Sequence, residues 1–124
     1  MNLNLFSSQG RWLMVDCGIT FEQANEDHRG RPSIQMPDPT FISSQRDQLD
    51  GLVVTHAHED HFGAIPYLWQ ELQCPVYATP FAAAVLRKKA AWRGAPPPAP
   101  LIEVLPGDTH TIGSFDVTWL PITH

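Results

Sequence analysis

Three histidines and two acidic residues stand within positions 56–61 of the sequence, HAHEDH. Imidazole nitrogens and carboxylate oxygens are ligands of zinc and similar divalent ions, and ligands two positions apart on an extended backbone can converge on one ion. His56 and His58 have that spacing. Asp60 and His61 are adjacent, so on a turning backbone their side chains point away from those of His56 and His58 and can bind a second ion. Because such groups are costly to crowd together without partners, the segment predicts a two-metal site.

The cluster lies between a predicted strand and a predicted helix. Residues 51–55, GLVVT, form a continuous apolar run typical of a strand buried on both faces. Beyond the cluster, apolar residues recur at helical spacing over 64–72. We therefore expect a loop at the end of a buried strand, where α/β sheets form their ligand-binding crevices. Glu59 is expected to be an exposed loop acid, because only one residue separates it from His61 and the zinc-protease motif HExxH needs two.

The remaining segments predict an α/β fold with a mixed sheet and helices packed on it. Residues 7–10 are expected to form a turn, the polar segment 19–39 a long surface loop, and the proline-rich segment 94–100 a stiff connector. The expected strands are 3–6, 11–16, 51–55, 75–79, 101–105, 110–112 and 115–120, and the expected helices are 43–49, capped by Ser43 or Ser44, 64–72 and 80–92.

Composition favours one domain without a broadly cationic surface. The 124 residues, 43% of them hydrophobic, suffice for one core. The net charge is −5, and the chain has eight Lys and Arg, which argues against non-specific nucleic-acid binding over most of the surface. The one basic cluster, Arg87, Lys88, Lys89 and Arg93, is interpreted as the solvated face of a helix.

Other polar and aromatic residues are given structural interpretations. His110 is expected to be an exposed strand residue. His28 is expected to be an exposed residue of the polar loop, the alternative being a place near a substrate entrance if that loop folds over the site. Tyr67, Trp69 and Trp92 stand at core-like spacing on the predicted helices, so packing is expected to explain them.

Cysteine usage and hydropathy bear on location. Cys17 and Cys74 form no CxxC pair, so we expect reduced thiols in a cytoplasmic protein. The sequence has no signal-peptide pattern and no run of about 18 apolar residues, so no membrane partner is expected.

The motif THAHEDH, preceded by a strand and followed by Gly63, resembles the signature of the metallo-β-lactamase fold superfamily. Within it, VVTHAHEDHFGAIPYL, CPVYAT, VDCGITF and MPDPTFI are similar to bacterial ribonuclease J, a family of RNA exonucleases and endonucleases. The resemblance extends from about Leu3 to His124. It implies an α/β fold of the αββα sandwich type, of which residues 1–124 are the N-terminal half.

The resemblance also implies a ligand set. His56 and His58, together with His124, correspond to the ligands of a first zinc ion. Asp60 and His61 correspond to the ligands of the second ion and take part in catalysis. Two Zn²⁺ ions, with Mn²⁺ as an alternative, are thus the expected cofactors, and RNA is the expected substrate. A homo-oligomer of the intact protein is left open.

Asp16 corresponds to an early aspartate of the family that hydrogen-bonds to the ligand loop; without the resemblance it would be an ordinary strand-end residue. The family also supplies a bridging aspartate and a last histidine from a later part of the fold, and a glycine-rich stretch before the position of Met1. Neither is present in the sequence. We therefore expect residues 1–124 to be an incomplete metallo-β-lactamase-like domain that lacks the nucleic-acid-binding insertion.

Three functions remain open at this point. The first is an RNA phosphodiesterase that uses a zinc-activated hydroxide. The second is a relative that hydrolyses a thioester, a lactone or a β-lactam with the same ions. The third is a non-catalytic truncated remnant that binds metal weakly through His56, His58 and His124, because an incomplete ligand set weakens both folding and affinity.

Overall fold

The computed structural model describes residues 1–22, 33–98 and 100–122. The strands are β1 (Leu3–Ser8), β2 (Arg11–Cys17), β3 (Thr20–Glu22), β4 (Ser33–Gln35), β5 (Leu49–Val53), β6 (Val76–Ala78), β7 (Leu101–Glu103), β8 (Thr109–Ile112) and β9 (Phe115–Thr118). The helices are α1 (Thr40–Ser44), the 3-10 turn η2 (Arg46–Gln48), α2 (Glu59–Phe62), α3 (Ile65–Leu72) and α4 (Pro80–Trp92).

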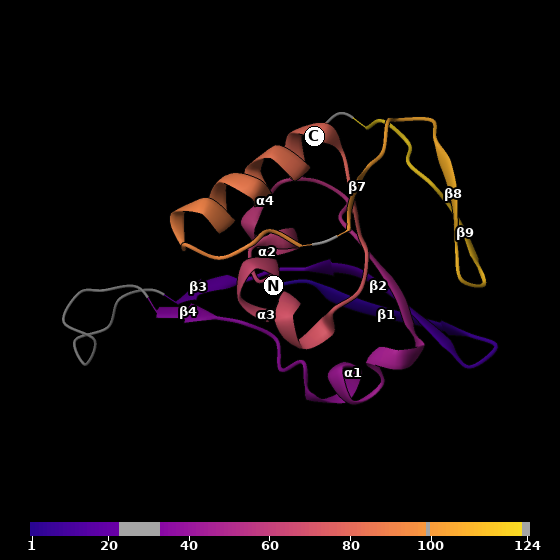
Figure 1. The fold of residues 1–124 in the computed structure, drawn as a ribbon, viewed down its shortest axis with the longest axis horizontal. Coiled ribbons are helices and arrows are strands. Elements are labelled where there is room, and N and C mark those ends of the chain that lie inside the picture. Colours follow the sequence, from indigo (N-terminus) through magenta and orange to yellow (C-terminus); the bar gives the residue numbers. More distant parts are fainter. Residues whose placement is uncertain (23–32, 99, 123–124) are drawn as a thin grey trace.

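The centre of the fold is a five-stranded mixed sheet in the order β1-β2-β5-β6-β7. β1 runs antiparallel to β2, and the other neighbouring pairs are parallel. β3–β4 and β8–β9 form two separate antiparallel pairs. The α/β class with a mixed sheet, predicted from the sequence, is therefore confirmed (Figure 1).

Side chains that alternate along the central strands enter two different cores. Met14 and Leu52 belong to a core shared with α3 and α4, whereas Leu13 and Val53 belong to a core shared with the β8–β9 hairpin. Neighbouring strand residues point to opposite faces of a sheet, so this division means that β2 and β5 are covered on both sides. Figure 1 shows α4 and the hairpin on opposite sides of β7. The continuous apolar run is thus explained by burial on both faces.

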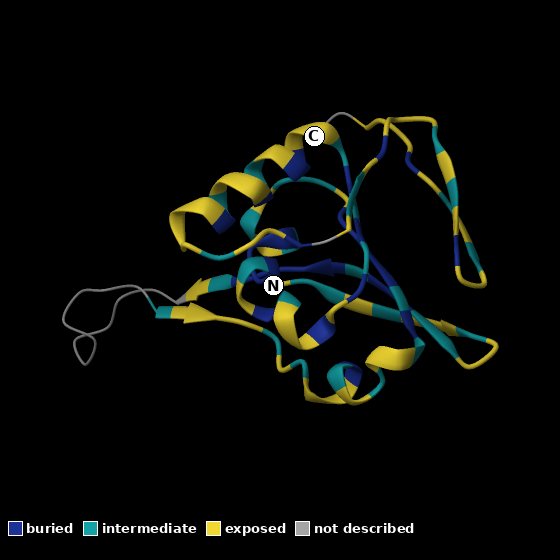
Figure 2. Cartoon of the chain, viewed as in Figure 1, coloured by how far each residue is buried: buried dark blue, intermediate teal, exposed yellow. Residues whose placement is uncertain are grey.

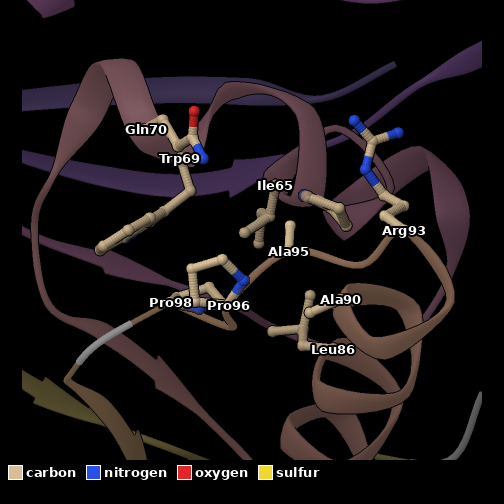
Figure 3. Close-up of a pocket in the computed structure, with 10 residues that line it drawn as sticks. Ile65, Trp69, Gln70, Leu86, Ala90, Arg93, Ala95, Pro96 and Pro98 are labelled. Carbon is tan, nitrogen blue, oxygen red and sulfur yellow. The ribbon is translucent and has the colours of Figure 1, made fainter.

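The proline-rich connector after α4 packs against the helices. Ala95, Pro96 and Pro98 face Ile65 and Leu86, as Figure 3 shows, and the cavity that remains between them is only about 20 Å³. This packing joins α4 to β7, which pairs with β6. The described residues 95–98 are therefore a packed part of the helix-covered face.

The helix predicted at 43–49 is replaced by two shorter elements, α1 and the 3-10 turn η2 (Arg46–Gln48), and its predicted cap is wrong. α1 begins at Thr40 and ends at Ser44, and neither predicted serine caps it. Instead, the carboxylate of Asp38 accepts a hydrogen bond from the Thr40 N–H (2.9 Å), and this local Asp turn starts the helix earlier.

Two other predicted boundaries need correction. The strand expected at 51–55 is β5, which begins at Leu49 because parallel pairing with β2 places Leu49 opposite Trp12. The loop expected at 19–39 contains β3 and β4, in which Phe21 pairs with Ile34 across the two strands. Each of these strands has three residues, which is too short for an alternating pattern to be recognised in the sequence. The predicted position of His28 lies outside the described residues.

No helix in the described part of the chain is long and apolar enough to cross a membrane. Both cysteines are free and buried in the helix-side core. Burial raises the pKa of the Cys17 thiol to about 12 and that of the Cys74 thiol to about 12. Both side chains are therefore neutral thiols at ordinary pH.

This predicts slow alkylation of the folded protein. The thiolate is the reactive form, so iodoacetamide at about pH 8 should leave Cys17 and Cys74 unmodified until the protein is denatured. Peptide mass spectrometry before and after denaturation measures the labelling. Rapid labelling of either thiol in the folded protein would contradict the described core.

Candidate functional site

Asp16 lies at the end of β2 and is the buried charged residue of the described chain, with 3% of its surface exposed. Its carboxylate accepts hydrogen bonds from the Thr55 N–H (2.8 Å), the Thr55 hydroxyl (2.8 Å) and Nδ1 of His61 (2.8 Å). Its φ of 64° is in the left-handed region, which is uncommon for any residue except glycine. Strain of this kind persists only where surrounding contacts enforce it, and here those contacts join two segments of the histidine cluster.

Backbone contacts hold the first turn of α2 against the end of β2. The Ile19 N–H donates to Glu59 O (2.9 Å), and the Asn2 N–H donates to Asp60 O (2.9 Å). A Cβ placed on Gly18 would clash with the carbonyl oxygen of Asp60. Glycine is therefore required at position 18 for the close approach of the two backbones.

The hydrogen bonds of the imidazoles determine which ring nitrogens carry lone pairs. His61 donates its Nδ1 proton to Asp16, which leaves the lone pair on Nε2. The single proton of the Thr55 hydroxyl is directed to Asp16, so that hydroxyl accepts the Nδ1 proton of His56 (3.0 Å). Both rings thus have the tautomer whose Nε2 can bind a metal.

The structure brings four predicted ligands together just beyond the end of β5. The ring centroids of His56 and His61 are 4.1 Å apart, and those of His56 and His58 are 4.6 Å apart. The Asp60 side chain is 55% exposed, and its carboxylate lies 3.4 Å from Nε2 of His61. The fifth predicted ligand, His124, lies outside the described residues.

The donor types fit zinc or manganese, because imidazoles and a carboxylate are all present. Within residues 1–22, 33–98 and 100–122, however, no group of three or more His, Cys, Asp or Glu side chains is arranged so that it could hold an ion. The rings of His56 and His58 meet edge to face, with 79° between their planes. The described residues therefore supply suitable ligand types, and hydrogen bonds orient the rings of His56 and His61, without a converged coordination sphere.

Two expectations for the cluster are corrected. The segment is not a loop throughout, because Glu59 begins the single turn of α2, in which the Gly63 N–H donates to Glu59 O (2.9 Å). Glu59 is also not a simple exposed acid. It is partly buried, and its carboxylate pairs with Lys89 Nζ of α4 (2.5 Å).

A hollow of about 440 Å³ adjoins the site on the face that carries the β8–β9 hairpin. His56 and Thr55 line it on one side, and its other walls are largely apolar. These walls include Val53, Trp119, Leu120 and Ile122. The histidine cluster therefore borders an open apolar space.

Sequence reasoning missed two residues that support the cluster. Asn2 donates from its side chain to Asp60 O (2.9 Å), and its Nδ2 lies 3.4 Å from Nε2 of His61. Thr55 connects His56 to Asp16. Thr55 stands directly beside the histidines in the motif, so its position was a usable signal. Asn2 carries no such signal, because its contacts join positions that are 58 residues apart.

Comparison with known proteins connects the chain to one family. A family model described as the metallo-beta-lactamase superfamily matches residues 2–124. A ribonuclease J of Sinorhizobium meliloti is 37% identical over 130 aligned residues, which cover 100% of this chain and 22% of that protein. A ribonuclease J of Mycolicibacterium smegmatis is 34% identical, with 99% and 21% covered. The chain thus spans about a fifth of the length of these relatives.

Solved structures agree on the fold. A subclass B3 metallo-β-lactamase from a soil metagenome library, MEM-A1, has a TM-score of 0.58 at 21% identity, covering 92% of this chain and 43% of that one. The metallo-β-lactamase MIM-1 of Novosphingobium pentaromativorans has a TM-score of 0.56 at 18% identity, covering 90% and 41%. At such identities the likeness concerns the fold alone.

The hydrogen bonds of Asp16 predict the effect of removing its carboxylate. Asp16→Ala leaves the donors of Thr55 and His61 without the carboxylate that accepts from them, which should lower the stability of the fold. We expect a lower melting temperature and a zinc affinity reduced roughly 10–100-fold, measured by thermal denaturation and titration calorimetry on the intact protein. Asp116→Ala, at an exposed residue of β9, is the control. Unchanged zinc affinity of Asp16→Ala would contradict the proposed support of the imidazoles.

The close approach at Gly18 gives a second prediction. Gly18→Ala forces α2 away from β2 and should lower both stability and zinc affinity. Gly10→Ala is the matched control, because Gly10 (φ 76°) has open space around its Cβ position and bears only backbone strain. Gly10→Ala should lower stability while leaving zinc affinity intact. Equal zinc affinities for the two variants would show that the contact between β2 and α2 does not position the ligands.

Proposed function

Because the chain belongs to the metallo-β-lactamase superfamily, whose members include hydrolases, we propose that it is part of a metal-dependent enzyme that hydrolyses RNA phosphodiester bonds. The observation that carries the proposal is the arrangement of His56 and His61. Hydrogen bonds that lead to Asp16 favour, in both rings, the tautomer whose Nε2 carries the lone pair that a metal would bind. The RNA substrate is supported by the relatives named ribonuclease J.

The proposed ligands are those of the sequence motif. His56 and His58, with His124, would hold one ion, and Asp60 and His61 would hold a second. When bound, two such ions activate a water molecule as hydroxide and neutralise the negative charge that develops on the phosphoryl oxygens. The side chains present favour zinc, with manganese as the alternative.

Other residues of the chain orient the proposed ligands. Asp16 keeps the proton on Nδ1 of His61 and so orients the ring. Thr55 does the same for His56. The two cysteines are unsuited to act as nucleophiles, because each is buried with its pKa raised to about 12. The proposed attack on phosphorus is therefore by water.

The activity is proposed for the intact protein, of which residues 1–124 would form the N-terminal part of the catalytic domain. This division of the domain stays a prediction, as does a homo-oligomeric state. The two buried free thiols support a cytoplasmic location, which is also a prediction.

The proposal predicts metal-dependent cleavage of RNA. The intact protein should lose cleavage of a labelled RNA oligonucleotide in chelator and regain it with zinc or manganese. His56→Ala should lower the rate of RNA cleavage by more than the roughly 10–100-fold expected when a residue that hydrogen-bonds to a metal ligand is removed. The reason is that this substitution removes a proposed ligand itself. His110→Ala, a histidine of β8 outside the cluster, should keep its activity.

Chelator-insensitive cleavage, or wild-type cleavage by His56→Ala, would contradict the proposal. A panel containing a thioester, a lactone and a β-lactam separates the other hydrolytic reactions. Hydrolysis of one of these, with RNA left intact, would keep the superfamily chemistry and overturn the RNA substrate.

A further inference from the structure

Two aromatic rings that were expected in the core lie on the surface. Trp92, at the end of α4, is 77% exposed, and Tyr67 of α3 is 40% exposed. The packing interpretation is wrong for these two residues and holds for Trp69, which is partly buried and donates its indole N–H to Cys74 O (2.9 Å). α4 buries Leu86 and Ala90 and turns its other side to solvent (Figure 2).

Cations lie over both exposed rings. Lys88 Nζ is 5.3 Å from the centroid of the Trp92 ring, and the guanidinium carbon of Arg93 is 4.1 Å from that of Tyr67. A shallow hollow of about 120 Å³ separates the rings and is lined by Pro66, Tyr67, Lys89, Trp92 and Arg93. In Figure 3 the Arg93 guanidinium points away from the packed residues beneath the connector. We call Tyr67, Lys88, Trp92 and Arg93 the aromatic–basic patch.

The patch concentrates positive charge in an acidic chain. Half of the eight Lys and Arg residues stand at positions 87–93, while the net charge of the chain is −5. Among the ion pairs of the described residues, Arg87 pairs with Glu103 and Lys89 with Glu59. Lys88 and Arg93 instead contact aromatic rings. In these contacts the positive charges of Lys88 and Arg93 face aromatic rings and not carboxylates. Such charges favour the binding of a polyanion.

One ion pair connects the patch to the histidine cluster. Lys89 lines the hollow, and its Nζ bonds the carboxylate of Glu59, which stands in the chain between His58 and Asp60. The same Nζ lies 5.8 Å from the Phe62 ring of α2. The hollow therefore adjoins the turn that carries two of the proposed ligands.

We propose that the aromatic–basic patch binds single-stranded RNA outside the hydrolytic site. An unpaired base stacks on Trp92 or Tyr67, and Lys88 and Arg93 contact the neighbouring phosphates. Exposed aromatic rings accept any base because every base has a π-face, and adjacent cations follow the backbone. A single-stranded segment fits better than a duplex, whose bases are stacked on one another. The inference rests on the proposed function for its choice of RNA.

An anionic membrane is the less favoured partner. Recognition of lipid headgroups by charge alone uses clusters of about 4–8 cations, whereas two of the four basic side chains here are engaged by carboxylates. A hollow between two rings also suits one planar base better than a flat lipid surface.

Binding is tested on the intact protein with a fluorescent single-stranded oligoribonucleotide in chelator, so that cleavage does not interfere. Trp92→Ala should raise the Kd about 10-fold or more, and Trp92→Phe should restore most of the affinity. Phe81→Ala is the matched control, because Phe81 is a 72% exposed ring at the other end of α4. Lys88→Ala and Arg93→Ala should each lower the salt dependence of log Kd by about 0.7, with exposed Arg46→Ala as the control.

Cleavage kinetics separate this inference from the proposed function. Trp92→Ala should raise KM for a long RNA with little change in kcat, and should leave cleavage of a dinucleotide unaffected. Equal Kd values for Trp92→Ala and Phe81→Ala would contradict RNA binding by the aromatic–basic patch. Binding of the protein to phosphatidylserine vesicles without binding to RNA would contradict it as well. RNA binding that depends on Trp92, in a protein without any RNA cleavage, would support the patch and contradict the proposed function.

Discussion

The buried carboxylate of Asp16 is the interaction on which the rest of the site depends. Parallel pairing of β2 with β5 brings the ends of both strands to one edge of the sheet, so Asp16 reaches the Thr55 N–H and hydroxyl directly beyond β5. A charge with so little exposure is costly unless it is fully hydrogen-bonded, and the bond from His61 contributes to that requirement. The strained backbone of Asp16 and the glycine at position 18 follow from the same constraint. The sheet thus orients the imidazoles through one side chain.

The elements predicted well from sequence are those with strong local signals. α4 begins and ends as expected at Pro80 and Trp92, because Thr79 caps it and proline suits its first turn. The turn at Gln9 and Gly10 is equally local, since both residues have positive φ. By contrast, the start of β5 depends on its register with β2, which no local pattern contains. Strands as short as β3 and β4 are stabilised by each other rather than by their own propensity.

In the candidate site, too, some residues can be recognised from the local sequence and others only from contacts between distant segments. The ligand types and spacing of residues 56–61 can be recognised from chemistry alone, and the structure places these side chains together. Asp16 could be identified only through the family resemblance, because 45 residues separate it from His61. The pair of Glu59 with Lys89 was missed for a related reason: it depends on how α4 lies against α2. That pair also links the turn of α2, which carries Asp60 and His61, to the aromatic–basic patch.

The motif at residues 56–61 is proposed to hold the metal ions used for hydrolysis. Anomalous X-ray scattering at the zinc edge, from crystals of the intact protein prepared with zinc, tests it most directly. We expect one peak at about 2.0–2.1 Å from imidazole nitrogens of His56 and His58, and a second peak beside Asp60 and His61. Zinc bound only elsewhere in the protein, or no ordered zinc at a saturating concentration, would contradict it.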